Sequence, residues 1–288
     1  SPAEKAALMV LAQRDIVPQS FADFCYFVTI RSDDPINPAP IPFELWPKQE
    51  ELAGILQSGK SIVLLKERQI GMTWLDAAYL YWRAAYHGWA CGYFSKGQDE
   101  AKKQIQRIQY IHEKLPAHLR GKLKFMAEEI VGEDGAGIQA FPSTENAGLS
   151  YTLQLAVMDE AAFHPYGQEN YEALKPAVKQ IIIQSTADPN LGPSGFMHDT
   201  YFKSKRGEMP YQALFFGRGS RPDRDEAWYE REERAYAGRG ESFDAYYPLT
   251  DAAAFVGRSG LVYGMWDESI HVQFDPCKWE ECKARYAG

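Results

Sequence analysis

The chain has few cysteines and no long apolar segment. Its 288 residues include only Cys25, Cys91, Cys277 and Cys282, which are too few and too scattered for a disulfide framework. No further ligands with zinc-finger spacing lie near the last two, which argues against structural zinc. There is no run of about 18 uninterrupted apolar residues and no signal-peptide pattern at the N-terminus. The sequence therefore predicts a soluble, intracellular protein without a membrane partner.

The chain also lacks an excess of positive charge. Its formal net charge is −8, whereas a protein that coats DNA by bulk attraction carries the opposite sign. Any contact with nucleic acid must therefore be local. With 45% hydrophobic residues, a chain of this length can bury the core of one large α/β domain and a smaller appendage.

The most informative stretch, 66–73, reads Lys-Glu-Arg-Gln-Ile-Gly-Met-Thr and is similar to a phosphate-binding loop. The apolar run 61–65 before it predicts a buried strand, and residues 74–82 after it predict a helix. In the usual loop, Gly-x4-Gly-Lys-Ser/Thr, backbone amides cradle the phosphates and the lysine reaches their outer oxygens. Gly71 and Thr73 fit this pattern, whereas Met72 replaces the lysine.

A cation is still needed, because clustered phosphate charge in a partly dry site is costly without one. Lys66 stands at the front of the loop and can reach the phosphates from its other end, with Arg68 two residues further on. The candidate phosphate-binding residues are Lys66, Glu67, Arg68, Gln69, Ile70, Gly71, Met72 and Thr73. Taken alone, the pattern also fits an ordinary strand-to-helix turn.

A second apolar run, 153–158, ends in two adjacent carboxylates, Asp159 and Glu160. At the end of a parallel strand beside a phosphate loop, Asp159 would hold Mg²⁺ through its water shell, together with Thr73. Glu160 would polarise the attacking water. The alternative is a solvated strand end.

Two further segments carry weaker signals. A third predicted strand, 180–184, ends in Ser185, Thr186 and Ala187, small residues that also suit a plain turn. Upstream of the loop, Trp46 and Gln49 occur shortly before the first strand. The glutamine amide can pair with both N6 and N7 of adenine, which would favour ATP. A capped helix start with a buried tryptophan explains the same residues equally well.

The ordered set of motifs resembles the ATPase half of the large subunit of tailed-bacteriophage terminases. It comprises Phe43–Gln49, Lys66–Thr73, Ser95–Ala101, Val157–Phe163, Ser185–Ala187, Arg221–Tyr229 and Phe243–Phe255. The resemblance implies an α/β P-loop NTPase of the RecA/ASCE-like type, with a mostly parallel central sheet flanked by helices and a small linker subdomain. Its cofactors would be ATP and Mg²⁺.

The resemblance also implies a role for each matching residue. Glu160 would be the catalytic carboxylate, Lys66 the displaced loop lysine, and Arg68 the loop arginine that stabilises transferring phosphate. Thr73 and Asp159 would place the metal, and Ser185, Thr186 and Ala187 would couple hydrolysis to movement. Many members supply an arginine in trans from before the catalytic strand, but this chain has no arginine between Gly121 and Lys205. The candidates elsewhere are Arg218, Arg221 and Arg224.

The function implied is Mg²⁺-dependent ATP hydrolysis that drives double-stranded viral DNA into a procapsid, in the host cytoplasm at the portal vertex. The implied partners are double-stranded DNA, the portal protein, the terminase small subunit and the C-terminal nuclease domain of a full-length protein. The assembled form would be a homo-oligomeric ring, although an isolated fragment can be monomeric. Two alternatives stay open: a superfamily-2-like helicase, and a non-catalytic nucleotide-binding assembly module.

The sequence divides into four expected regions. Residues 1–42 form a helical segment with a proline-rich connector, which would be either a lid over the nucleotide or a support. Residues 43–208 form the ATPase core and 209–250 the linker subdomain. Residues 251–288 would begin the nuclease region, and we expect no nuclease activity from this chain.

Overall fold

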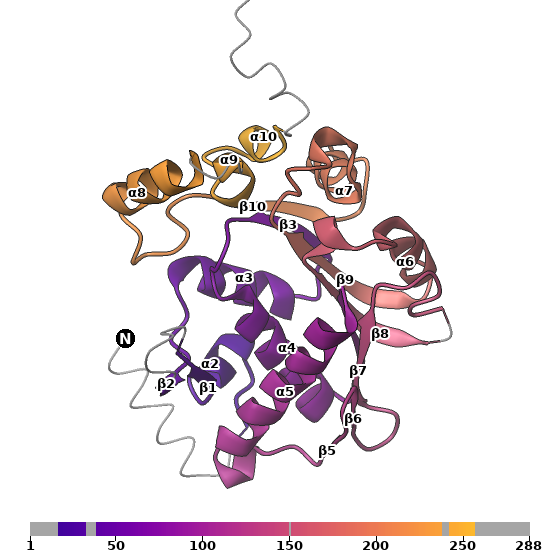
Figure 1. Ribbon diagram of the computed structural model, residues 1–288. Coiled ribbons are helices and arrows are strands. Elements are labelled where there is room, and N and C mark those ends of the chain that lie inside the picture. Colours follow the sequence, from indigo (N-terminus) through magenta and orange to yellow (C-terminus); the bar gives the residue numbers. More distant parts are fainter. Residues whose placement is uncertain (1–16, 33–38, 150, 238–241, 257–288) are drawn as a thin grey trace, which may run out of the picture.

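An eight-stranded sheet forms the centre of the protein (Figure 1). The computed structural model describes residues 17–32, 39–149, 151–237 and 242–256. The strands of this sheet are β3 (Ile62–Lys66), β4 (Ala90–Ser95), β5 (Lys124–Phe125), β6 (Glu129–Val131), β7 (Gly137–Pro142), β8 (Leu153–Asp159), β9 (Val178–Ser185) and β10 (Gln212–Phe216). Their order is β10-β3-β9-β8-β4-β7-β6-β5, parallel from β10 to β7 and antiparallel at β6 and β5. The predicted fold class is confirmed.

Helices cover both faces of the sheet (Figure 1). One face carries α2 (Phe21–Cys25), α3 (Pro47–Gln57), α4 (Met72–His87) and α5 (Gln98–Lys114), and the other carries α6 (Gly167–Leu174) and α7 (Phe196–Lys205). All five residues of β3 are buried because successive side chains alternate between two covered faces. Ile62 and Leu64 join the core on the α4 side, whereas Val63 and Leu65 join the core on the α7 side.

The register brings the ends of three parallel strands to one edge of the sheet. Leu65 pairs with Ser185, and Asp159 pairs with Gln184. The strand β9 therefore lies between β3, which leads into the loop, and β8, which ends in the carboxylates. Ligands of open parallel sheets bind at this carboxyl edge.

The described part of the N-terminal segment supports the core. Phe21 and Phe24 are fully buried, and their rings lie 4.9 and 5.8 Å from those of Tyr79 and Tyr81 on α4. A small antiparallel pair, β1 (Thr29–Arg31) and β2 (Pro40–Pro42), follows. The predicted helix at residues 3–14 lies outside the described residues.

The C-terminal elements sit over the edge of the sheet at which β3 and β10 end (Figure 1). They are α8 (Glu226–Ala237), α9 (Phe243–Tyr246) and α10 (Asp251–Ala254). Strand β10 pairs with β3, so the sheet extends past residue 208, where the sequence suggested that the core ends. Residues 251–255 pack on α7, where the ring of Phe255 lies 5.7 Å from that of Phe202. The remaining residues assigned to a nuclease region, 257–288, lie outside the described part. No described helix is long and apolar enough to span a membrane.

Candidate nucleotide-binding site

The loop between β3 and α4 has the backbone of an anion-binding turn. Gln69 and Gly71 adopt left-handed conformations, with φ of 60° and 70°, and α4 begins at Met72. Within the described part of the chain, no hydrogen bond uses the amide N–H of Gln69, Ile70 or Gly71. Consecutive free amides at a helix N-terminus form a concave site that attracts phosphate.

Lys66 and Glu160 meet at the carboxyl edge of the sheet. Lys66 Nζ donates to Glu160 Oε1 at 2.8 Å, and the lysine side chain is 6% exposed against 38% for the glutamate. Burial alone would lower the pKa of Lys66, but the negative charges of Glu160 and Asp159 raise it overall. Burial would likewise raise the pKa of Glu160, and the charge and hydrogen bond of Lys66 outweigh it, so this pKa is lowered. Both groups therefore stay charged near neutral pH.

Glu160 is held in a strained backbone conformation. Its φ of 53° lies in the left-handed region, which costs a non-glycine residue of order 1–3 kcal/mol. Its amide donates to Asp159 Oδ1 at 3.0 Å, and Ser185 Oγ donates to Glu160 Oε2 at 3.5 Å. The backbone N–H of Thr186 also faces this carboxylate and helps to lower its pKa. The structure thus brings Lys66, Glu160, Ser185 and Thr186 together.

Asp159 is buried and fully engaged by hydrogen bonds. Tyr93 Oη donates to Oδ2 at 2.8 Å and Gln184 Nε2 donates to Oδ1 at 2.9 Å. A carboxylate fixed in this way suits an outer-shell role, because Mg²⁺ keeps several waters and takes phosphate oxygens as ligands. Thr73 lies in the first turn of α4, and its carbonyl accepts a hydrogen bond from Gln104 Nε2 at 3.1 Å. The described residues contain no cluster of three His, Cys, Asp or Glu side chains that would hold a metal by itself.

A second buried carboxyl lies behind this edge. Gln184 Nε2 donates to Asp76 of α4 as well as to Asp159, so one amide bridges the two acids. Burial, followed by the charge of Asp159, raises the pKa of Asp76 well above its ordinary value. No sequence pattern pointed to Asp76, Gln184 or Tyr93, because single polar residues inside apolar runs form no pattern until the fold joins them.

The residues expected to bind adenine line a cleft beside the loop. It has a volume of about 640 Å³, and its walls include Trp46, Gln49, Gly71, Trp74 and Arg221. Gln49 is buried, its Oε1 accepts from Trp46 N at 2.9 Å, and its Nε2 donates to Ile70 O at 3.0 Å. The amide that was expected to read adenine is therefore occupied within the protein, where it ties the start of α3 to the loop.

Arg68 points away from Lys66 and Glu160. Its guanidinium lies 3.7 Å from the ring centre of Tyr246, and Nη1 donates to Tyr236 Oη at 3.3 Å. A cation over an aromatic ring at a partly exposed site is worth about 0.5–1 kcal/mol, so this position is readily exchanged for a stronger anionic partner.

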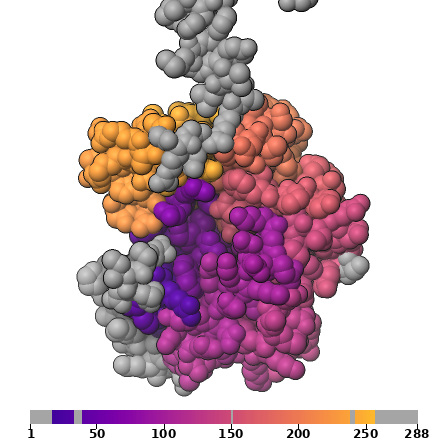
Figure 2. Space-filling model, in the orientation of Figure 1, coloured from indigo at the N-terminus to yellow at the C-terminus, as the bar shows by residue number. Residues whose placement is uncertain are grey.

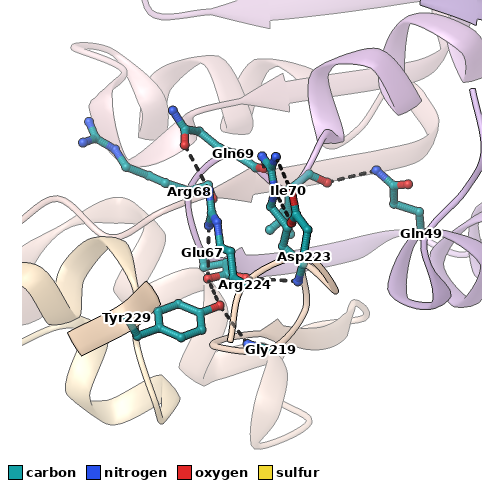
Figure 3. A network of polar contacts seen from close by, with 10 residues as sticks. Gln49, Glu67, Arg68, Gln69, Ile70, Gly219, Asp223, Arg224 and Tyr229 are labelled. Atoms are coloured by element: carbon teal, nitrogen blue, oxygen red, sulfur yellow. Dashed lines mark hydrogen bonds and ion pairs between the residues drawn. The ribbon is translucent and has the colours of Figure 1, made fainter. Parts of the chain in front are cut away.

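The three candidate trans arginines all make contacts within their own chain. Arg218 donates to Tyr247 O at 2.7 Å and to Asp244 at 3.0 Å. Arg221 and Arg224 instead lie against the phosphate loop, together with the buried carboxylate of Glu67 (Figure 3). Figure 2 shows the same relationship at the surface, where the orange C-terminal segment rests on the purple loop region.

Solved structures with this fold are large terminases of bacteriophages. The HK97 large terminase matches with a TM-score of 0.58 and 14% identity over 86% of this chain and 52% of that one. The large terminase ATPase domain of Thermus phage P74-26 matches with 0.53 and 16% over 72% and 93%. The large terminase of another thermophilic bacteriophage, solved in complex with ADP, matches with 0.55 and 16% over 78% and 57%.

These likenesses confirm the predicted resemblance at the level of the fold, which is that of the large terminase ATPase domains. This chain spans about half the length of the HK97 large terminase, 52%. No family model matches the sequence.

Proposed function

We propose that this chain is a Mg²⁺-dependent ATPase domain of the terminase large-subunit type. The observation that carries the proposal is the placement of Lys66 beside Glu160 at the carboxyl edge of the sheet. The adjacent loop has three amides that form no hydrogen bond within the described residues. Because the loop lacks its late lysine, a cation at its front end is what a triphosphate site would need. The ADP complex of a thermophilic bacteriophage's large terminase supports nucleotide as the ligand of this fold.

In the proposed reaction, water attacks the γ-phosphoryl group in line with the leaving oxygen. The loop amides and Lys66 hold the phosphates, which releases Glu160 from its ion pair to orient the water. Glu160 is suited to this task because its lowered pKa keeps it an acceptor. Arg68 moves from Tyr246 to the transferring phosphoryl group, where positive charge stabilises the transition state.

Mg²⁺ would supply further neutralisation of phosphate charge. Thr73, at the first turn of α4, and Asp159, at the end of β8, are the residues that would hold it. Ser185 and Thr186 lie at the end of β9, between these strands, and contact Glu160. Loss of the γ-phosphate would therefore be felt first at β9, which is the basis of their proposed coupling role.

The cellular role rests on the fold likeness and is proposed with it. It is the packaging of double-stranded DNA into a procapsid, within a homo-oligomeric ring at the portal. The portal protein, the small subunit and a nuclease domain of the full-length protein would be partners. The acidic net charge of −8 requires that DNA be held by a local surface.

The proposal is tested by Mg²⁺-dependent phosphate release from ATP, with and without double-stranded DNA. We expect turnover in the wild type and none in Glu160→Gln, which should still bind ATP. Binding without turnover in both proteins would favour the non-catalytic assembly module, and strand separation of a duplex would favour a helicase. Failure of the wild type to bind ATP would refute the nucleotide site itself.

A further inference from the structure

Three consecutive carbonyl groups of the phosphate loop are each held by a side chain from outside the loop (Figure 3). The donors and their carbonyl partners are Arg224 Nη1 to Arg68 (2.8 Å), Arg221 Nη1 to Gln69 (2.8 Å) and Gln49 Nε2 to Ile70 (3.0 Å). Two of these donors come from the segment after β10, more than 150 residues away along the chain. Both arginines are thus engaged by the loop of their own chain.

Holding a carbonyl fixes the direction of the amide that follows it. The peptide groups here are trans, and in a planar trans peptide the C=O and the next N–H point in opposite directions. The amides of Gln69, Ile70 and Gly71 therefore point away from the three anchoring side chains. These are the same amides that form no hydrogen bond in the described part of the chain.

We propose that Arg221 and Arg224 are positioning residues that act in cis, by turning the loop amides toward the phosphates. The proposal rests on the proposed nucleotide site and adds the linker segment to it. It replaces the trans role that the sequence suggested for these two arginines. A preorganised set of amides binds an anion more tightly than a mobile loop, because the ordering has been completed before binding.

The buried carboxylate of Glu67 explains why arginines occupy these positions. Glu67 is fully buried, and its Oε2 accepts from Tyr229 Oη at 2.9 Å and from Arg224 Nη1 at 3.4 Å. Its Oε1 accepts from the backbone N–H of Arg221 at 3.2 Å. The forked guanidinium of Arg224 can therefore contact Glu67, the carbonyl of Arg68 and the side chain of Gln69 at once.

The test compares Arg221→Gln and Arg224→Lys with Arg218→Gln. The control makes the same type of change in the same segment, but Arg218 contacts Tyr247 and Asp244 and not the loop. In Arg224→Lys, a positive charge still faces Glu67, but one ammonium group cannot span all three partners. Arg221 is 18% exposed, so its substitution keeps the test available if the buried Arg224 variant fails to fold.

Binding of Mg²⁺–ADP and of Mg²⁺–pyrophosphate is measured by calorimetry, and folding is checked by thermal unfolding. Pyrophosphate has no base, so it separates amide alignment from a contact in the cleft that Arg221 also lines. We expect each loop-facing variant to bind both ligands about tenfold more weakly, as the loss of one hydrogen bond would give, with the control unchanged. In ¹⁵N-labelled protein, pyrophosphate should shift the amide signals of residues 69–71 in the wild type and shift them less in the variants.

Unchanged affinity with reduced turnover would overturn the proposal and favour an arginine acting on a neighbouring subunit. Weaker binding of ADP but not of pyrophosphate would also overturn it, because Arg221 would then contact the nucleoside directly. If the wild type binds neither ligand, the proposed nucleotide site itself fails, a result distinct from wild-type binding that the variants leave intact.

Discussion

Lys66 Nζ lies 2.8 Å from Glu160 Oε1, so the two groups with the central proposed roles neutralise each other in this structure. A bound triphosphate would compete with Glu160 for the lysine, and the freed carboxylate would then face water. In this arrangement the catalytic acceptor becomes available only when phosphate is present, which would limit futile contact with solvent.

Substitutions on the two sides of this ion pair should have different effects. Glu160→Gln should lower turnover by about 10² to 10⁴-fold, the usual worth of positioned acid–base help, with ATP affinity retained. Lys66→Ala should weaken binding and turnover together, because it removes the cation at the front of the loop. Both are measured by phosphate release and by titration with a fluorescent ATP analogue. Normal hydrolysis in Lys66→Ala would contradict the assignment of the displaced lysine.

The pH dependence of stability should show no transition from this pair near neutrality. A lowered glutamate pKa gives stability that is present above its ordinary value of 4.5 and is lost as pH falls through the lowered pKa. A raised lysine pKa gives stability that is present below its ordinary value of 10.5 and is lost as pH rises through the raised pKa. The difference in unfolding free energy between wild type and Lys66→Met should therefore be flat between pH 5 and pH 10, roughly the interval between the two ordinary pKa values. A step inside that interval, measured by urea unfolding, would contradict the charge states assigned here.

Arg68 should be needed for turnover, although it now rests on the linker. Arg68→Ala should reduce turnover with little change in ATP affinity, because its proposed contact forms only with the transferring phosphoryl group. Tyr236→Phe removes the hydroxyl that accepts from Arg68 and should leave turnover equal or up to about fivefold higher, since a weak hydrogen bond no longer retains the side chain. Equal loss in both variants, by steady-state kinetics, would mean that the position on Tyr246 is the working one.

Local patterns predicted the strands that matter most and missed how they are arranged. Strands β3, β8 and β9 were predicted because each is a continuous apolar run, as burial on both faces requires. The insertion of β9 between the other two depends on pairing between distant segments, which the sequence does not display. The short strands in residues 124–142 were missed, because they have mixed polarity and few residues.

The same limit applies to the site. Lys66, Asp159 and Glu160 were predicted, since they belong to contiguous motifs with a known chemical logic. The anchoring of the loop by Arg221 and Arg224 joins residues more than 150 positions apart, and nothing local marks it. Gln49 was assigned to adenine because its amide has the right donor and acceptor, but the loop carbonyl of Ile70 is the partner that the fold supplies.

Asp76 should reduce stability as pH rises. Its pKa is raised well above 3.8 by burial and by Asp159, so near neutral pH the folded protein keeps a proton that the unfolded chain releases. Stability from this group is then greatest at low pH and declines as pH rises above 3.8. Asp76→Asn should raise the midpoint of thermal unfolding, and by more at pH 8 than at pH 5, in Mg²⁺-free buffer. Asp134→Asn, the same change on an exposed loop, is the control. A smaller gain at pH 8 than at pH 5 would contradict the raised pKa.

Gly71 and Gly88 provide a matched pair for the geometry of the loop. Their φ values are 70° and 68°, so alanine at either position meets the same left-handed backbone strain, about 1–2 kcal/mol. Around Gly88, nothing lies within 4 Å of an added Cβ, whereas at Gly71 the Cβ would lie 2.5 Å from Gln49 Nε2. Gly71→Ala should therefore also displace Gln49 from Ile70 O, release one anchored carbonyl and weaken binding of Mg²⁺–ADP by about tenfold. Gly88→Ala should lose similar stability from backbone strain but bind ADP as the wild type does. Equal affinities in the two variants would show that the contact between Gln49 and the loop has no part in holding the nucleotide.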